Sequence, residues 1–427
     1  MQRHESYKPS GVKWLGDVPS HWNVQTLRAV TQLKSDRNRP DLPVLSVYRE
    51  YGVIRKDSRD DNHNATSLDT STYKVVQPGD LVVNKMKAWQ GSMGISAYEG
   101  IVSPAYITCS TKSERVLPGY LHYLLRSSSL IGVYNSLSYG VRVGQWDMHY
   151  EDFKQIAIPL PSTEEQSRIV AFLDRKTSET DASIAKKERL IQLLEESKRS
   201  LINQAVTGGL SGNAPLVPTG LSWFPVAPAH WKLKRLKTIS SFITSGPRGW
   251  SERLSDEGAV FLQSGNLNDS FGIDMESAHR VVVPKGAEAR RTRLHDDDVL
   301  ICITGANTGR IAVANTGMQE AYINQHLSLA RLKEANPKFV AYSLSAQGST
   351  YFMLCQYGLK EGLSLFDVAN APILLPSLDE QNEIVAFLDQ GVVKIDMAMA
   401  ASIKQCQQLE ELKRTMIAEA VIGRQVQ

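Results

Sequence analysis

Several short polar segments of this sequence carry side chains that could hydrogen-bond to the edges of DNA bases. Arginine can bond two acceptors of guanine, asparagine and glutamine can do the same with adenine, and lysine mainly neutralises phosphates. The candidates in the first half of the chain are Asn84, Lys85, Lys87, Trp89, Gln90, Arg142, Gln145 and Trp146. Those in the second half are Ser245, Arg248, Trp250, Gln263, Asn266, Thr304, Asn307, Thr308, Arg310, Asn324, Gln325 and His326. We interpret them as candidate base-reading loops; ordinary surface solvation is the competing interpretation for any single residue.

No residue pattern typical of catalysis accompanies these groups. The sequence has neither a GxxxxGK[ST] phosphate loop nor an HExxH zinc motif. Gly305–Arg310 is glycine-rich but lacks the Lys-Ser/Thr end of a phosphate loop. Ser103–Tyr106 has Ala105 where the Asn/Asp-Pro-Pro-Tyr signature of amino-methyltransferases has its second proline. We therefore expect no catalytic residue in this chain.

Composition sets wider limits. The 427 residues are 42% apolar and 22% charged with a net charge of +3, which neither requires nor excludes nucleic acid. The cysteines have no CxxC or Cys/His ligand spacing, so we expect no metal site and four reduced thiols: Cys109, Cys302, Cys355 and Cys406. The first ten residues lack an apolar core and no run of 18 apolar residues occurs, so we expect a cytoplasmic protein without a membrane span.

The polar groups lie between short runs typical of β-strands. These runs are LPVLSVY, DLVVNK and YITCS in the first half, and VFLQSGN, RVVVP, DVLICIT, RIAVAN and LSLARL in the second. Helices are expected at Tyr120–Ile131 and Pro337–Leu354. The run that starts at Asp80 matches the run that starts at Asp298, so we expect two related domains with different loop residues.

A long helix follows each domain, and the two helices repeat each other. They align without a gap at an offset of 215 residues, which carries Glu165 onto Glu380 and Gly208 onto Gly423. A serine three residues before each glutamate predicts a capping box at the helix start, and each glycine predicts a C-terminal cap.

Seam residues advance through both helices by alternating steps of four and three, the period of a coiled coil. The apolar seam residues are Leu173, Ile184, Ile191, Leu194, Leu201, Leu388, Ile395, Met399, Leu409 and Met416. Other seam positions are polar, including Lys198 and Lys413, so we expect helices of a partner to complete the packing. A pair of purely structural arms is the competing interpretation.

A second repeat precedes each domain, at an offset of 209 residues. Gly11–Trp22 reads GVKWLGDVPSHW and Gly220–Trp231 reads GLSWFPVAPAHW; we name both the PxHW motif. We expect its tryptophans to pack the domain on the helix. No carboxylate partner is apparent for His21 or His230, so both are expected to be structural. A Gly/Pro/Ser linker enters the second motif, and a linker of similar length would join the C-terminus to the first motif. We therefore expect the chain ends to lie close together.

The sequence thus predicts an α+β protein with a pseudo-two-fold internal repeat and two long antiparallel coiled-coil helices. Its four segments are a first domain over 1–160, a helix over 161–208, a second domain over 209–375 and a helix over 376–427.

The duplicated PxHW motifs and EQxxIVAFLD helix starts, Glu165–Asp174 and Glu380–Asp389, closely resemble the DNA-specificity (S) subunit of type I restriction-modification systems. The resemblance covers essentially the whole chain. It implies two target recognition domains that each read one half of a bipartite, asymmetric site in double-stranded DNA, with the helices fixing the unread spacer.

The resemblance also implies partners. Two methyltransferase (M) and two motor-nuclease (R) subunits would dock on this chain. They would bind S-adenosylmethionine, ATP and Mg²⁺, whereas this chain would bind no cofactor and would not be an enzyme. The assembly would methylate DNA and defend the cell against phage.

Two other classes of protein stay open at this point. A coiled-coil scaffold that binds only proteins would explain the helices but not the duplicated polar loops, and salt-dependent DNA binding separates it from the S-subunit interpretation. A catalytic methyltransferase or nuclease would need a cofactor or metal site, and binding of S-adenosylmethionine by the purified chain alone would support it.

Overall fold

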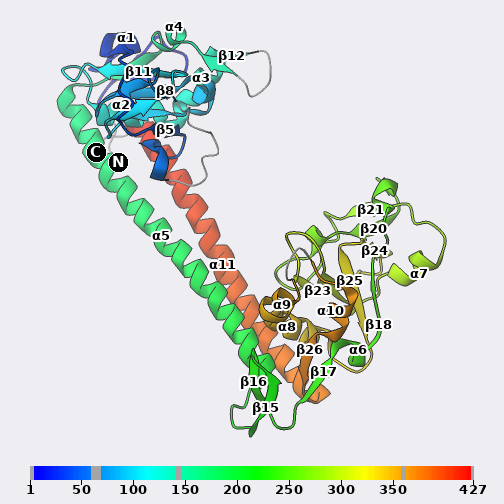
Figure 1. Ribbon diagram of the computed structural model, residues 1–427. Helices are drawn as coiled ribbons and strands as arrows, with labels where there is room; N and C mark the ends of the chain where they lie inside the picture. The colour runs from blue at the N-terminus through cyan, green and yellow to red at the C-terminus, as the bar shows by residue number, and fades with distance from the viewer. Residues whose placement is uncertain (1–3, 59–68, 141–145, 357–361, 425–427) are drawn as a thin grey trace. The chain divides into compact units, whose positions relative to one another are not determined.

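The computed structural model describes residues 4–58, 69–140, 146–356 and 362–424, and it divides into two units. Unit 1 comprises residues 1–187 and 404–427, and unit 2 comprises residues 188–403. Each unit contains one globular domain and part of two long helices, α5 (Thr163–Gly208) and α11 (Leu378–Val421) (Figure 1). Both helices start two residues inside their predicted segments.

A four-stranded antiparallel sheet forms the centre of the unit 1 domain. Its strand order is β4-β11-β8-β9, with bounds Thr31–Lys34, Tyr106–Thr111, Leu81–Asn84 and Met93–Ile95. Leu81 and Val83 of β8 share an apolar cluster with Tyr120 and Leu124 of α2 (Pro118–Arg126). The runs DLVVNK and YITCS are thus confirmed as central strands.

The unit 2 domain is built around a sheet with the same plan. Its order is β18-β25-β22-β23, again antiparallel, with bounds Ser240–Ser245, Leu327–Leu332, Val299–Cys302 and Ile311–Val313. α8 (Pro337–Gln347) takes the place of α2, and its Phe339 and Leu344 join Val299 and Ile301 in one apolar cluster. The expectation of two related domains is confirmed.

Shorter elements complete each domain. In unit 1 they are β1 (Tyr7–Pro9), β2 (Asp17–Pro19), β3 (Asn23–Thr26), α1 (Leu27–Val30), β5 (Leu45–Tyr48), β6 (Gly52–Arg55), η1 (Lys56–Ser58), β7 (Lys74–Val76), η2 (Lys85–Gln90), β10 (Gly100–Val102), η3 (Ser128–Leu130), α3 (Ile131–Leu137), β12 (Ser138–Tyr139), β13 (Asp147–Met148), α4 (Tyr150–Phe153) and β14 (Ala157–Leu160). In unit 2 they are β15 (Leu216–Leu221), β16 (Phe224–Pro228), β17 (Lys232–Arg235), α6 (Leu236–Ile239), η4 (Trp250–Arg253), β19 (Leu254–Ser255), β20 (Ala259–Leu262), η5 (Ser264–Asn266), β21 (His279–Val281), α7 (Ala287–Thr292), β24 (Ala321–Ile323), η6 (Gly348–Phe352), α9 (Met353–Cys355), α10 (Leu365–Asn370) and β26 (Pro372–Leu375).

The predicted seam is confirmed within each unit, because every apolar seam residue is buried or half-buried. Polar seam residues pair inside the chain. Lys413 Nζ lies 2.6 Å from Asp181 Oδ1 in unit 1, and Lys198 Nζ lies 2.7 Å from Asp396 Oδ1 in unit 2. In unit 1, Asp181 of α5 bonds Lys413 of α11. Lys187 lies further along α5 but bonds Gln405, which lies earlier in α11. The two helices therefore run antiparallel there. Lys198 and Lys413 thus have carboxylate partners within the chain, and docking of partner helices stays a prediction.

The helix ends follow the predicted pattern in part. Ser162 and Ser377 each accept a hydrogen bond from the backbone N–H of the glutamate three residues later, Glu165 or Glu380. The glutamate side chains bond elsewhere, so only the serine half of each capping box forms as predicted. Gly423 has a φ of 75° as expected, but in α5 the left-handed cap is Gly209, with a φ of 73°, one residue beyond the predicted Gly208.

The EQxxIVAFLD sequence anchors each helix on its own domain. Gln166 Oε1 accepts the Leu117 N–H and its amide donates to Arg115 and Pro161 carbonyls; Gln381 likewise bonds Asn336 and Pro376. At the other end of the motif, Tyr123 and Tyr342 each donate to an aspartate oxygen at 2.7 Å, Asp174 or Asp389. Both copies of the EQxxIVAFLD sequence thus make equivalent hydrogen bonds to their own domains.

Each PxHW motif packs against the start of a long helix. Trp22 and Trp231 are buried, which confirms their packing role, and Trp14 and Trp223 pack half-buried on the same clusters. The expectation that His21 and His230 lack a carboxylate partner is wrong: each Nε2 lies 3.0 Å from the helix glutamate, Glu165 or Glu380.

The two ends of the chain meet in unit 1, as predicted. The Tyr7 hydroxyl donates to the Gly423 carbonyl at 3.0 Å, and Pro19 and Trp22 lie beside Gly423. The linker into the second motif is only partly irregular, because Leu216–Leu221 pairs with β16 as a hairpin. Within the part of the chain that the structure describes, no helix combines the length and apolarity needed to cross a membrane.

Candidate nucleic-acid interface

The first candidate loop of unit 1 begins where β8 ends. Asn84 is the last residue of β8, and η2 carries Lys85, Lys87, Trp89 and Gln90. Trp89 meets Trp146 edge to face, with ring centroids 5.4 Å apart, and Lys85 Nζ lies 3.2 Å from Asp147 Oδ2. The structure therefore joins two clusters that are far apart in sequence. Two predicted members of the second cluster, Arg142 and Gln145, lie outside the described residues.

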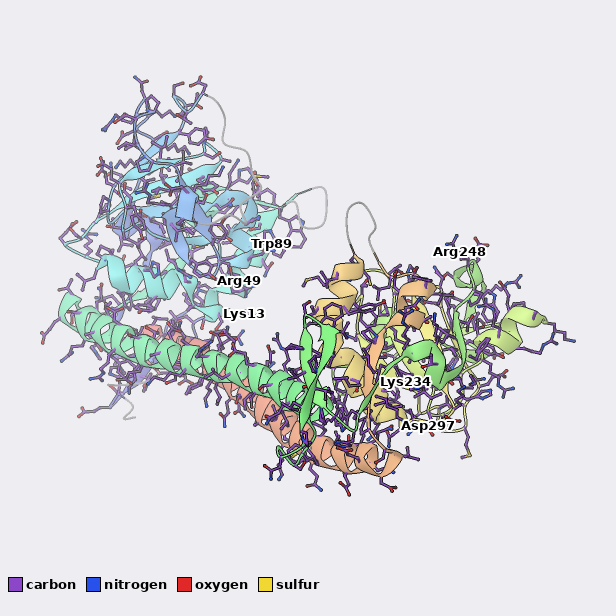
Figure 2. The ribbon with its side chains drawn as sticks, turned by 60° about the horizontal axis from the view of Figure 1, so that its bottom comes forward. Lys13, Arg49, Trp89, Lys234, Arg248 and Asp297 are labelled. Atoms are coloured by element: carbon purple, nitrogen blue, oxygen red, sulfur yellow. The ribbon has the colours of Figure 1, made fainter. Side chains whose placement is uncertain are left out.

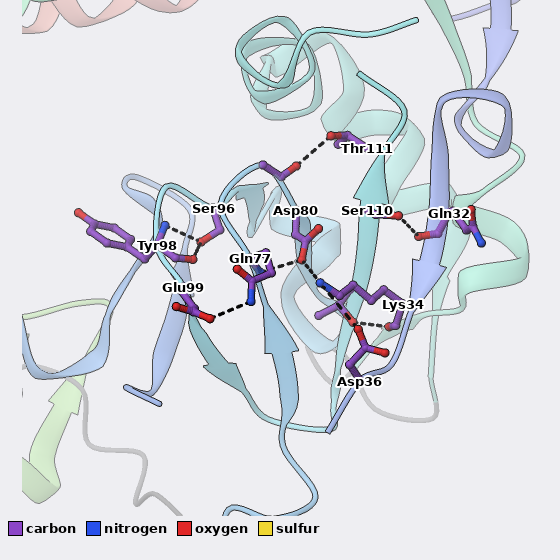
Figure 3. A network of polar contacts seen from close by, with 12 residues as sticks. Gln32, Lys34, Asp36, Gln77, Asp80, Ser96, Tyr98, Glu99, Ser110 and Thr111 are labelled. Carbon is purple, nitrogen blue, oxygen red and sulfur yellow. Dashed lines mark hydrogen bonds and ion pairs between the residues drawn. The ribbon is translucent and has the colours of Figure 1, made fainter. Parts of the chain in front are cut away.

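A largely buried ion pair lies directly before β8, at the end of the strand opposite to this loop. Asp80, at the start of β8, accepts hydrogen bonds from Lys34 Nζ of β4 and from the Gln77 backbone N–H, both at 2.8 Å (Figure 3). At the other end, the Asn84 N–H bonds the Ser92 carbonyl, and Gly91 turns the chain with a φ of 84°. The exposed Lys87 is thus presented from a fixed frame.

Positive charge gathers beside β8. Burial, and then the nearby charges of Arg37 and Lys85, lower the pKa of Lys74. Lys74 Nζ also donates to the Tyr106 carbonyl at 2.5 Å, at the start of β11. Sequence reasoning missed Arg37 and Lys74, because only the fold brings them to Lys85. A group of like charges of this kind attracts phosphate.

In unit 2 the corresponding loops meet through His326. His326 Nδ1 lies 2.5 Å from Thr304 Oγ1, just after β22, and Nε2 lies 3.2 Å from Gln325 Nε2. The His326 backbone N–H donates to Asn324 Oδ1, which orders the turn before β25. The Asn324–Leu327 turn precedes β25 as Ser103–Tyr106 precedes β11 in unit 1, so the two segments occupy equivalent places.

A second group in unit 2 fastens one loop to another. Asn307 Nδ2 donates to the Ser264 carbonyl, Arg310 Nη1 donates to the Leu267 carbonyl, and Arg310 Nη2 lies 3.2 Å from Asp269 Oδ1. Thr308 Oγ1 bonds the Gly305 carbonyl within its own turn. These side chains position loops 263–269 and 304–310 beside each other.

Not every candidate is free to touch a ligand. Trp250 is only 3% exposed and packs with Phe261 and Tyr322, so its ring belongs to the core. Asn266 is buried and bonds the Gln263 N–H and Ser277. By contrast, Arg248 is exposed, on a loop beside η4 (Figure 2).

The apolar seam residues are buried or half-buried, so they offer little free surface. Sequence reasoning missed a different set of apolar helix residues that are exposed: Leu190, Leu193, Val393, Met397 and Leu412.

The two domains that share a sheet order also match one and the same family model. A model of the type I restriction modification DNA specificity domain matches residues 19–193 and again residues 228–405. The chain belongs to this family. It is a type I specificity subunit, the member of such systems that recognises DNA sequence, and specificity subunits are non-catalytic as a class.

Known relatives support the assignment. The chain is 23% identical over 364 residues to the EcoKI specificity subunit of Escherichia coli (strain K12), covering 82% of this chain and 75% of the relative. It is 21% identical over 453 residues to the putative MjaX specificity subunit of Methanocaldococcus jannaschii, covering 99% and 97%.

Solved structures share the fold. A chain from a type I R-M system is similar with a TM-score of 0.73 at 18% identity, over 95% of this chain and 98% of that one. The HsdS subunit from Thermoanaerobacter tengcongensis is similar with a TM-score of 0.54 at 19% identity, over 96% and 98%.

Proposed function

We propose that the two domains of this specificity subunit each read one half of a bipartite, asymmetric DNA site. The observation that carries this proposal is the shared sheet order of the two domains with different side chains in equivalent loops. After β8, unit 1 presents Lys85, Lys87 and Trp89; after β22, unit 2 presents Thr304, which contacts His326. One scaffold with two sets of loop chemistry suits two different half-sites.

The exposed and half-buried candidates would contact DNA, and the buried ones would hold them in place. Lys85 and Lys87, with the Lys74 group, suit phosphates, whereas Arg248 and Gln325 suit base edges. Trp250, Asn266 and Arg310 would act by positioning loops.

The long helices would set the unread spacer between the half-sites. They contain 46 and 44 residues, and each continues from one unit into the other. At about 1.5 Å per residue each is roughly 65–70 Å long.

The exposed apolar helix residues would dock two M subunits, and two R subunits would complete the assembly. S-adenosylmethionine, ATP and Mg²⁺ would be bound by those partners, so this chain would supply recognition without catalysis.

The test uses the chain assembled with its M subunits. Sequencing methylated DNA from cells with and without the chain gives the target, and gel shifts then compare DNA altered in one half-site at a time. Arg248→Ala should weaken binding and alter base discrimination in the half-site read by unit 2 only, because Arg248 suits base edges. Lys87→Ala should weaken binding to all DNA sequences alike and reduce the salt dependence, because it removes a phosphate contact. Equal changes of discrimination at both half-sites for Arg248→Ala would refute the assignment.

A scaffold that binds only proteins predicts a different result. The proposed reader loses affinity steeply as salt rises, because bound lysines and arginines release counterions from DNA. A complex that shows no salt-dependent DNA binding would favour the scaffold. Binding of S-adenosylmethionine by the chain alone would instead indicate catalytic function.

A further inference from the structure

Three potential metal ligands meet where the N-terminal segment of unit 1 crosses the start of α5. They are His4, His21 of the PxHW motif and Glu165, and one donor atom from each lies within 4.8 Å of the other two. Glu165 Oε2 lies 3.0 Å from His21 Nε2, and Oε1 lies 3.8 Å from His4 Nε2. Sequence reasoning missed the group, because His21 and Glu165 are 144 positions apart.

Tertiary contacts hold His4 in this place. Its backbone N–H bonds the Tyr7 hydroxyl, which itself donates to the Gly423 carbonyl. Its ring packs edge to face on Trp22 with centroids 5.9 Å apart. The side chains of His4 and Glu165 are only 14% and 11% exposed, whereas His21 is 57% exposed and leaves one side open.

The surroundings of Glu380 in the second repeat differ from those of Glu165 in the first repeat. At the offset of 209 residues, Asn213 stands where the first repeat has His4. There, Glu380 accepts from both His230 Nε2 and Trp231 Nε1. In unit 1, Trp22 Nε1 is buried with no hydrogen-bond partner among the described residues, and Glu165 Oε1 faces His4 instead. The carboxylate of Glu165 therefore has one oxygen directed at His21 and the other directed at His4.

We propose that His4, His21 and Glu165 bind one Zn²⁺ ion, with water in the fourth position. Two imidazoles and a carboxylate are a usual ligand set for this ion, at bond lengths of about 2.0–2.2 Å. Donors around a tetrahedral ion are then roughly 3.3–3.6 Å apart. Each imidazole faces its own oxygen of Glu165, at 3.0 and 3.8 Å, and one donor atom from each residue lies within 4.8 Å of the other two, so small side-chain rotations would bring the three donors around one ion. The ion would fix the N-terminal segment to the first turn of α5.

The experiment titrates the full chain, with its native N-terminus and no affinity tag, with Co²⁺ and then Zn²⁺. We expect one equivalent of Co²⁺ to give the intense visible absorption of a tetrahedral site, and Zn²⁺ to displace it and raise the Tm. His4→Asn copies the second repeat. It should lower the affinity at least about tenfold, since losing a ligand costs no less than losing a supporting residue.

His230→Asn is the matched control, because it removes an equivalent histidine–glutamate contact where the third ligand is lacking. It should leave Co²⁺ binding unchanged, and circular dichroism checks that both variants fold. Absence of saturable binding, or equal binding by wild type and His4→Asn, would show that the group is only a hydrogen-bonded contact. A thiolate-to-cobalt absorption band would place the ion on a cysteine and overturn the proposal.

Discussion

Lys198 and Asp396 form an ion pair with 2.7 Å between Nζ and Oδ1, and the internal repeat maps this pair onto Lys413 and Asp181. Each helix thus supplies the lysine of one pair and the aspartate of the other. The environments differ: the Lys198 side chain is 13% exposed and Asp396 is 27% exposed, against 29% and 56% for Lys413 and Asp181.

Asp396→Asn should therefore destabilise the chain more than Asp181→Asn. Charged hydrogen bonds that are shielded from water contribute about 1.5–3 kcal/mol, whereas exposed ion pairs contribute about 0–1 kcal/mol. Urea unfolding of both variants measures the difference in the free energy of unfolding. Equal losses would mean that burial does not distinguish the two pairs.

Thr304→Val should impair recognition at the half-site of unit 2, because it removes the hydroxyl bonded to His326. We expect about 1–3 kcal/mol less discrimination against a wrong base there. Gel shifts with DNA altered in each half-site measure it. Thr304→Ser keeps the hydroxyl and serves as the control; a similar loss in both variants would assign the effect to packing.

Stability should depend on pH through His122, whose Nδ1 accepts the Ile95 N–H. Burial, and then the charge of Arg126, lower the pKa of His122 from 6.5 to about 4. The folded state therefore favours the neutral ring. The stability of the folded state that depends on a neutral His122 ring is fully present above the unfolded pKa of 6.5. It is lost as the pH falls from 6.5 towards 4.

Lowering the pH from about 7.5 to about 5 should reduce the free energy of unfolding by about 2 kcal/mol through His122. His122→Gln should remove that part of the slope in urea unfolding at the two pH values. The exposed His279→Gln is the control, and it should retain the wild-type slope. A slope unchanged by His122→Gln would contradict the prediction.

Adding seven residues to each long helix, after Lys187 in α5 and after Ile403 in α11, should lengthen the tolerated spacer. Seven residues keep the seam in phase and add about 10 Å, equivalent to about three base pairs. Sequencing methylated DNA reads out the spacer. An unchanged spacer with active protein would refute the ruler role.

Periodic features could be predicted from the sequence, and contacts between distant residues could not. The seam from Leu173 to Leu201 follows directly from its 3.5-residue period, and burial confirms it. The His21–Glu165 contact depends on how the PxHW motif folds back on α5, which no local pattern states. Trp250 has a residue type suited to base stacking, yet it lies in the core, because polarity and position at a turn do not determine burial.

The same limit applies to the candidate loops. Their position between strands was predictable, since Asp80 and Asp298 directly precede β8 and β22 in matching runs. Their mutual contacts, such as Trp89 with Trp146, arise only once the chain is folded.

The two domains neutralise these matching aspartates differently. Asp80 takes its cation from Lys34 on β4, which is separated from β8 by β11, whereas Asp298 takes two hydrogen bonds from Arg331 on β25, which pairs directly with β22. A chimaera that moved β4 or β25 alone between the domains would leave one buried carboxylate without a counter-charge and give the other a surplus. Functional grafts between such domains should therefore exchange either the loops alone or the whole sheet, and a crossover within the sheet should yield chains that fail to fold.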